Sequence, residues 1–259
     1  MNDGASQRDI RAYEAAYAST YDFESVQVRF RREAVLASLL ARTPRRVVEI
    51  GCGMEPLLPH YLAASGSDVD WWVVVEPAPM FAASARTVGQ ECPGMVVLED
   101  FYGDAVAEGI VRDHGHADFV ICSGLLHEVT DQAALLRAIR TAMGADAILH
   151  VNVPNASSLH RRLAKAMGLI GHLEQMSDRS VLMQHQRVYS MASLHVDLAA
   201  AGLRPLETGG IFMKPFTHAQ MSSVVGMLGE DILPGLAVLG RDFPELASEI
   251  FVNAVAHAD

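Results

Sequence analysis

The feature that most constrains the fold is a regular alternation of short apolar runs with stretches of helical spacing. Between the runs, apolar residues recur three and four positions apart, as in 57–62 and 134–139. Strands that alternate with helices form βαβ units, and strands that are apolar throughout are covered on both faces, so an α/β fold with a mostly parallel sheet is predicted. The runs expected to form its strands are 46–50, 70–75, 95–98, 118–122 and 147–153.

Three segments depart from this alternation. Residues 1–44 predict a helical cap that ends at Thr43-Pro44. Residues of about 155–190 and 215–245 form long insertions, and the first has amphipathic spacing, so helical lids are expected rather than linkers. Further strands near 203–212 and 249–255 complete the expected sheet.

Composition argues against several kinds of partner. The formal net charge is -11 and no segment gathers basic residues, so nucleic acid is not expected. No apolar run is long enough to span a bilayer, and the first residues lack the apolar core of a secretory signal. A soluble cytoplasmic protein without membrane contact is therefore expected, and whether it forms a homodimer is left open.

The cysteines and two nearby histidines give no sign of a metal centre. Cys52, Cys92 and Cys122 form no CxxC pair and are odd in number, which favours neither a disulfide framework nor a zinc site. His114 and His116 have no acidic or cysteine partner at ligand spacing. No metal is predicted from the sequence.

A glycine turn follows the first predicted strand. Gly51 can adopt conformations that other residues avoid, and Gly53 lets a ligand approach the main chain. The helix expected to start near Pro56 offers free N–H groups, so a polar ligand is expected against the turn. Pro56 stands where the dinucleotide fingerprint GxGxxG needs glycine, which disfavours a dinucleotide. Glu49, at the strand end, suits a ligand with an ammonium group.

A second acid ends the second predicted strand, in Val75-Glu76-Pro77. A carboxylate at this place can accept hydrogen bonds from both hydroxyls of a ribose, as the acid of dinucleotide-binding folds does. The alternative is a solvated charge at a strand end. Together with the glycine turn, Glu76 favours a nucleoside-containing ligand.

These motifs, in this order, resemble the class I methyltransferases that depend on S-adenosylmethionine (SAM), over about residues 45–256. Three passages resemble bacterial members that act on small natural products or sugars: 153–155, 187–190 and 209–215. One departure is Glu55 in place of a third glycine, and its side chain is expected to point away from the cofactor or to cap the helix start. The motifs that carry the family resemblance are 49–53, 76–77, 99–101 and 123–129.

The resemblance implies a seven-stranded Rossmann-like sheet of order 3-2-1-4-5-7-6, with the seventh strand antiparallel, in a SAM-binding domain at 45–259. It implies that the 51–53 turn passes beneath the methionine part of SAM, that Glu76 binds the ribose, and that Asp100 and the Phe101 backbone meet the adenine. The 123–125 loop would line the sulfonium side. The candidate cofactor-binding residues are Tyr21, Arg29, Glu49, Gly51, Cys52, Gly53, Glu76, Pro77, Asp100, Phe101, Ser123 and Leu125.

Methyl transfer from a sulfonium is a single displacement, so the protein must align the reactants and exclude water. The cap and the two insertions are expected to act as lids. Tyr17 or Tyr21 would close over the cofactor, with Arg29 near its carboxylate. The alternative is that these aromatics pack on the sheet.

His127 is the candidate for removing the acceptor's proton, because it follows the fourth strand where substrate and cofactor meet in this fold. Glu128 is the candidate for orienting it. The alternatives are that His127 only shapes the wall of the pocket, or that the acceptor is a carboxylate and needs no base.

Substrate-binding candidates come from two later segments. Arg187 and Tyr189 lie in an alternating stretch after the first insertion, and the arginine could hold a carboxylate or phosphate of the acceptor through two hydrogen bonds. A surface salt bridge is the alternative for Arg187. His150 is included as a third candidate, although its place within a strand favours a buried, hydrogen-bonded histidine.

The sequence therefore predicts a SAM-dependent methyltransferase that transfers a methyl group to the oxygen or nitrogen of a small molecule, such as a natural product, sugar or carboxylate. Two other functions stay open. One is an NAD(P)- or flavin-dependent oxidoreductase, because glycine turns of this kind are shared between folds. The other is a catalytically silent module that keeps the SAM-binding fold as a scaffold.

Overall fold

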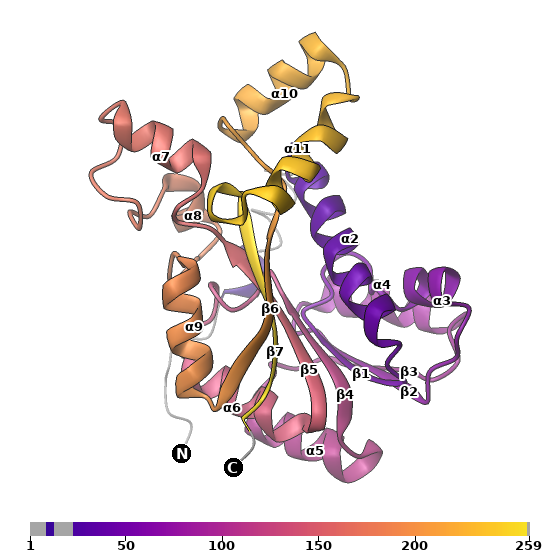
Figure 1. Cartoon of the computed structure of the whole chain (residues 1–259). Coiled ribbons are helices and arrows are strands. Elements are labelled where there is room, and N and C mark those ends of the chain that lie inside the picture. Colours follow the sequence, from indigo (N-terminus) through magenta and orange to yellow (C-terminus); the bar gives the residue numbers. More distant parts are fainter. Residues whose placement is uncertain (1–8, 13–22, 258–259) are drawn as a thin grey trace.

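The computed structural model describes residues 9–12 and 23–257 (Figure 1). Its single sheet has the order β3-β2-β1-β4-β5-β7-β6. Strand β7 is antiparallel to both β5 and β6, and the other neighbours are parallel, so the predicted topology is confirmed. The strands are β1 (Arg46–Ile50), β2 (Trp71–Val75), β3 (Met95–Leu98), β4 (Ala117–Ser123), β5 (Met143–Pro154), β6 (Leu203–Ile211) and β7 (Glu249–Ala256).

Helices cover both faces of the sheet (Figure 1). One layer consists of α2 (Glu24–Arg42), α3 (Leu58–Ser65) and α4 (Pro79–Gly89). The other layer consists of α5 (Asp104–His114), α6 (Gln132–Ala142) and α9 (Met191–Ala200).

Burial on both faces explains why the central strands are apolar throughout. Every residue of β2 is buried. Val73 belongs to the core packed against α5, α6 and α9, whereas its neighbours Trp72 and Val74 belong to the core packed against α2, α3 and α4. Successive side chains of a strand point to opposite faces, so a strand between two helical layers needs apolar residues at both.

The two insertions contain helices, and they lie beyond the end of the sheet at which the parallel strands finish (Figure 1). Apolar residues of the first insertion remain exposed, including Leu163, Met167 and Leu169. The helices are α7 (Leu159–Ala166) and α8 (Asp178–Leu182) in the first insertion, and α10 (His218–Leu228), α11 (Ile232–Asp242) and the 3₁₀ turn η1 (Pro244–Leu246) in the second.

The second insertion is pressed tightly against β6. A Cβ atom on Gly210 would lie 2.4 Å from the Gly240 carbonyl oxygen and 2.6 Å from Ala247 Cβ. A Cβ on Gly240 would lie 2.4 Å from the Phe212 backbone nitrogen. The absence of side chains at these two glycines therefore lets α11 approach the strand closely.

The structure also bears on the predictions about disulfides and about membrane-spanning segments. All three cysteines are free and buried, in agreement with the absence of a predicted disulfide framework. Within the described residues, no helix has both the length and the apolar character needed to cross a membrane.

Candidate active site

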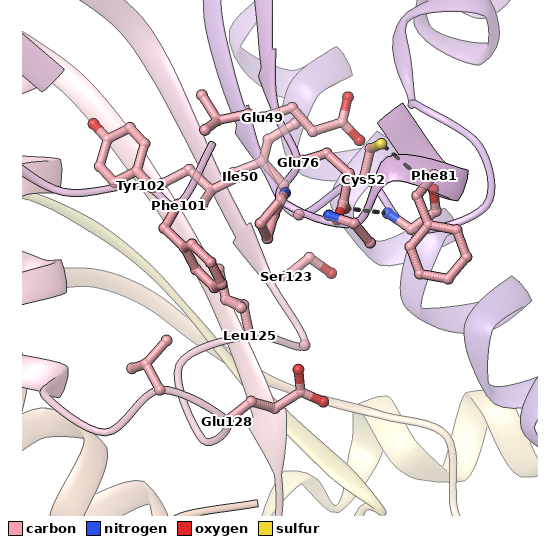
Figure 2. Close-up of a pocket in the computed structure, with 18 of the residues that line it drawn as sticks. Glu49, Ile50, Cys52, Glu76, Phe81, Phe101, Tyr102, Ser123, Leu125 and Glu128 are labelled. Atoms are coloured by element: carbon pink, nitrogen blue, oxygen red, sulfur yellow. Dashed lines mark hydrogen bonds between the residues drawn. The ribbon is translucent and has the colours of Figure 1, made fainter. Parts of the chain in front are cut away.

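A cavity of about 450 Å³ lies at the carboxyl ends of β1, β2 and β4. The strand order reverses between β1 and β4, and in open α/β sheets ligands bind in the crevice at such a point. Figure 2 shows side chains from four separate loops around this space, among them Glu76, Phe101, Ser123 and Leu125. We call it the first cavity.

The glycine turn forms the floor of the first cavity. Gly51 and Gly53 have φ angles of 72° and 61°, in the left-handed region that favours glycine. The Gly51 N–H donates to the Val75 carbonyl at 2.9 Å, which ties the turn to β2. No atom lies within 4 Å of the place a Cβ of Gly53 would occupy, so the main chain is open to a ligand there.

Glu55, at the position of the third glycine found in many family members, is among the residues that line the first cavity, and its carboxylate contacts α2 and α3. Its carboxylate lies 3.0 Å from His60 Nε2 and 3.6 Å from an Arg32 nitrogen. At the start of α3 the N–H of the N-cap residue Leu57 donates to Glu49 and not to Glu55, so the prediction that Glu55 caps the helix is not supported.

Glu76 reaches back over the turn. One carboxylate oxygen accepts the Gly53 N–H at 3.2 Å, and the other accepts the Ala78 N–H at 2.9 Å. The side chain is 5% exposed and lines the first cavity. The alternative of a solvated strand-end charge is therefore wrong.

Glu49 lies buried behind the same turn. Its oxygens accept the Leu57 N–H, each at 3.1 Å, and one of them accepts the Trp72 Nε1–H at 2.8 Å. Burial raises the pKa of Glu49 from the ordinary 4.5 to about 7, although these two donors and the Arg32 charge favour the ionised form. Glu49 can therefore change its charge near neutral pH.

Five further candidates for cofactor binding line the first cavity, and Asp100 does not. The Asp100 carboxylate instead accepts the backbone N–H of Phe101 at 2.7 Å. This hydrogen bond involves one oxygen of the carboxylate, and the contact of Asp100 with the adenine stays a prediction. The candidates that do line the cavity are Cys52, Pro77, Phe101, Ser123 and Leu125.

The prediction that Arg29 lies near the carboxylate of the cofactor is corrected by its position on α2. Residues Ser25, Arg29, Glu33 and Ala37 follow one another at four-residue steps along the exposed face of α2. Arg29 pairs there with Glu33 at 3.9 Å, outside the first cavity. Arg31 and Arg32, on other faces of the helix, line the cavity instead. Tyr17 and Tyr21 lie outside the described residues.

Several lining residues were not predicted from the sequence. Phe81 enters from α4 and Tyr102 from the loop after β3. Gln184 and Gln186 enter from the end of the first insertion. Of the two glutamines, only Gln186 falls within the alternating stretch 185–189, and it occupies an even position, whereas Arg187 and Tyr189 were the predicted ones.

A second cavity of about 190 Å³ adjoins the first, and the two share Arg31, Gly124 and Glu128 in their walls. Charged side chains from α2, the first insertion and the segment after β6 line it. Arg31 donates to Glu249, and Lys214 donates to Gln27 at 3.1 Å. The second cavity is thus a polar chamber beside the first.

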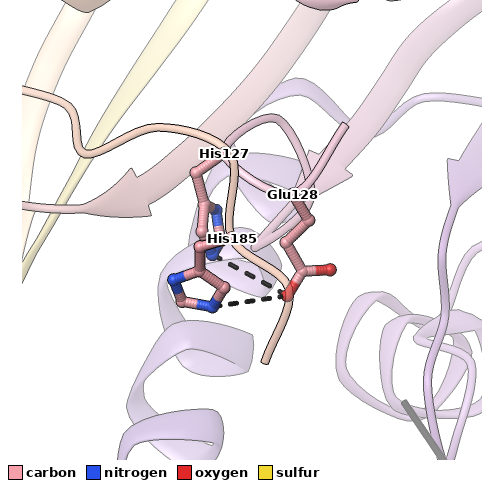
Figure 3. Close-up of side chains that lie close together, drawn as sticks. All are labelled: His127, Glu128 and His185. Atoms are coloured by element: carbon pink, nitrogen blue, oxygen red, sulfur yellow. Dashed lines mark ion pairs between the residues drawn. The ribbon is translucent and has the colours of Figure 1, made fainter. Parts of the chain in front are cut away.

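His127 and Glu128 lie at the junction of the two cavities. Both are nearly buried, and His127 Nε2 is 3.8 Å from a carboxylate oxygen of Glu128. Figure 3 shows His185, from the end of the first insertion, beside both of them. His127 and His185 line only the second cavity, whereas Glu128 lines both cavities.

The substrate-binding candidates Arg187 and Tyr189 have different surroundings in the structure. Arg187 lines the second cavity, and its guanidinium donates to Asp197 at 2.6 Å and lies over the Tyr189 ring. Tyr189 is fully buried in the core and its hydroxyl donates to Asp197 at 2.8 Å. The prediction that Tyr189 contacts the acceptor is corrected, since it lines neither cavity.

The prediction that His150 binds the acceptor is also corrected. It is fully buried within β5, with Nδ1 2.8 Å from Asn253 Oδ1 and 3.2 Å from Ser38 Oγ. Burial lowers the pKa of its imidazole to about 4. It lines neither cavity and has the hydrogen-bonded character expected of a histidine within a strand.

Three solved structures share this fold with the chain. A 1,6-didemethyltoxoflavin-N1-methyltransferase from Burkholderia thailandensis, with bound 1,6-didemethyltoxoflavin and S-adenosylhomocysteine (SAH), is 13% identical over 96% of this chain and 87% of its own, with a TM-score of 0.58. The plantazolicin methyltransferase BamL, in complex with a desmethyl plantazolicin analogue and SAH, is 13% identical over 96% and 98%, with a TM-score of 0.56. A SAM-dependent methyltransferase from Mesorhizobium loti is 15% identical over 87% and 97%, with a TM-score of 0.57.

No curated protein matches the sequence significantly. Residues 24–208, however, match the family described as a methyltransferase domain, and this match covers well over half of the chain. The matched segment contains the glycine turn, Glu76 and the loops that line the first cavity. The chain belongs to this methyltransferase family and is an enzyme that uses S-adenosylmethionine.

Proposed function

We propose that the enzyme transfers the methyl group of SAM, bound in the first cavity, to an oxygen or nitrogen of a small molecule bound in the second. The observation that carries this proposal is the shared wall at Gly124 and Glu128, where the two cavities meet. Displacement at a methyl carbon needs donor and acceptor in line, which two adjoining chambers can provide. Two methyltransferases of the same fold carry small molecules beside SAH in their structures: a triazolic desmethyl plantazolicin analogue in BamL, and 1,6-didemethyltoxoflavin in the Burkholderia thailandensis enzyme.

The residues of the first cavity fit SAM. The bare main chain at Gly53 can lie against the methionine part, and Glu76 is placed to accept hydrogen bonds from the ribose hydroxyls. Arg32 and Glu49 offer opposite charges for the carboxylate and the ammonium group. Phe101 offers an aromatic face to the adenine. Bound SAM supplies an activated methyl group, and the protein positions it.

The second cavity favours a polar acceptor of modest size. Arg187 remains our candidate for holding a carboxylate or phosphate of the acceptor, although it must share its guanidinium with Asp197. Removal of the acceptor's proton by His127, oriented by Glu128, stays a prediction; both residues lie in the wall that an acceptor would contact. The buried free cysteines suit the cytoplasm that we propose as the compartment.

A binding titration followed by an activity assay tests this function. We expect calorimetry to show one SAH per chain and no binding of NAD or NADP. With radiolabelled SAM, transfer of label to a small-molecule fraction is expected when extracts or candidate acceptors are supplied. Binding of SAH without transfer to any acceptor would instead favour a silent module.

The affinity for SAH is expected to rise about tenfold between pH 6 and pH 8. The free protein holds Glu49 protonated below its pKa of about 7, and the ammonium group of SAH favours the carboxylate, so binding strengthens as the proton is lost. The groups facing Glu49 are Arg32 from α2, Glu76 directly after β2 and Cys52 from the turn. Calorimetry at several pH values measures this dependence.

Glu49→Gln is the matched variant, because an amide oxygen can still accept from Leu57 and Trp72. Its affinity for SAH is expected to vary little over the same pH range. An equally steep dependence in this variant would show that another group is responsible.

A further inference from the structure

Three side chains with metal-binding atoms meet where the two cavities adjoin. The Nε2 atoms of His127 and His185 each lie 3.8 Å from the same carboxylate oxygen of Glu128. One potential ligand atom from each residue lies within 4.8 Å of the other two, and Figure 3 shows the three side chains turned toward one another. We call His127, Glu128 and His185 the His–Glu–His cluster.

Backbone contacts hold the two contributing loops together. The His127 carbonyl accepts the N–H groups of Gln186 at 2.9 Å and Arg187 at 3.3 Å. The His185 N–H donates to the Ser180 carbonyl at 2.9 Å. Gln184 has a φ of 56°, in the left-handed region that residues other than glycine rarely adopt. This unusual conformation occurs directly before His185, the residue that completes the cluster.

The surroundings of the cluster suit a metal with an open coordination position. His127 and Glu128 are buried and the His185 side chain is 17% exposed, so bulk water has little access. All three line the second cavity, which leaves one side of the cluster facing the chamber. The nearby cations Arg31 and Arg187 are paired with Glu249 and Asp197.

We propose that the His–Glu–His cluster binds one divalent first-row transition-metal ion, such as Zn²⁺, Mn²⁺ or Fe²⁺. Two imidazoles and one carboxylate form a ligand set that these metals favour, with further positions left for water or substrate. Metal–ligand bonds of about 2.1 Å place neighbouring ligand atoms roughly 3.0–3.5 Å apart. The two 3.8 Å separations therefore need to shorten by about 0.5 Å, and the two imidazole nitrogens, which lie within 4.8 Å of each other, also have to move closer.

Such an ion would hold the acceptor by an oxygen or nitrogen in the second cavity. For a hydroxyl acceptor, it favours loss of the proton to solvent. The oxygen lone pair then forms the bond to the methyl carbon, and the electrons of the broken carbon–sulfur bond stay on sulfur. This role rests on the proposed function, whereas binding of the metal does not, and it gives His127 the task of a ligand rather than a base.

Metal titration of the chelator-treated full chain tests the proposal. Calorimetry with Zn²⁺ and absorption spectra with Co²⁺ are expected to show one saturable site per chain. His185→Ala is expected to weaken that site at least tenfold and to alter the Co²⁺ bands. Because His185 does not line the first cavity, SAH binding by this variant is expected to stay within about twofold of the unchanged protein and shows that the fold is intact.

His172→Ala is the matched control. His172 and Glu174 also lie 3.8 Å apart, but both are exposed and they are not part of any three-residue group of ligands among the described residues. The proposal is overturned if no saturable site appears, or if His185→Ala and Glu128→Gln bind metal as tightly as the unchanged protein. Failure of SAH to bind would count against the proposed function and leave the metal result standing.

Discussion

Glu76→Ala is expected to weaken the binding of SAH about 100-fold. In the proposed complex this carboxylate accepts hydrogen bonds from both ribose hydroxyls, and two such bonds to a charged group contribute about 3 kcal/mol together. The substitution also leaves the N–H groups of Gly53 and Ala78 without their acceptor, which loosens the turn on which the cofactor lies. Each 1.4 kcal/mol is tenfold in affinity, hence about 100-fold.

Calorimetry with SAH measures this effect, and Glu99→Ala is the matched control. Glu99 follows the neighbouring strand β3, but it is exposed, pairs with Arg86 at 2.7 Å and does not line the first cavity. The control is expected to bind SAH as the unchanged protein does. If Glu76→Ala bound SAH with normal affinity, the first cavity would not hold the ribose against this strand.

Gly210→Ala is expected to lower the free energy of unfolding by about 3 kcal/mol, at the upper end of what overpacking costs. The added methyl group would meet the Gly240 carbonyl oxygen at 2.4 Å and the Pro244 Cα at 2.6 Å, which are main-chain atoms that no change of rotamer can move. The melting temperature should fall by roughly 6–12 °C for a chain of this size. Thermal and denaturant unfolding followed by circular dichroism measure both quantities.

Gly226→Ala is the control for this substitution. Gly226 lies within α10, and no atom lies within 4 Å of the place its Cβ would occupy. Alanine is expected to be neutral or to stabilise by up to about 1 kcal/mol there. If both variants were equally stable, α11 and η1 would be able to move away from β6 at little cost.

The sheet could be predicted from the sequence because its signals are local. Strands such as β2 and β4 are continuous apolar runs, and their predicted limits agree with the structure to within one residue at each end. Strand β5 starts four residues earlier than its predicted run, at Met143, because α6 passes into it almost directly at Ala142. The glycine turn and Glu76 were also found because each follows a strand directly.

Side-chain directions could not be predicted in the same way. Arg29, Arg31 and Arg32 stand close together in the sequence, and only the packing of α2 decides which of them faces the first cavity. Tyr189 pairs with Asn155 beside the end of β5, and its ring lies in the core. The direction of each of these side chains depends on tertiary contacts, which the spacing of residues in the sequence does not reveal.

The absence of a predicted metal site has a similar cause. Ligand motifs are recognised when their members lie a few residues apart. His127 and Glu128 are adjacent, but the third member, His185, comes from the far end of the first insertion. The two loops meet through backbone hydrogen bonds from Gln186 and Arg187 to the His127 carbonyl, which the sequence does not reveal.

Residues 184–187 divide their side chains between the two cavities: Gln184 and Gln186 line the first, and His185 and Arg187 line the second. A rotation of this short strip would reshape both chambers in a single movement. A change that moves the backbone of this strip, unlike one that only shortens a side chain, would therefore alter the walls of both chambers.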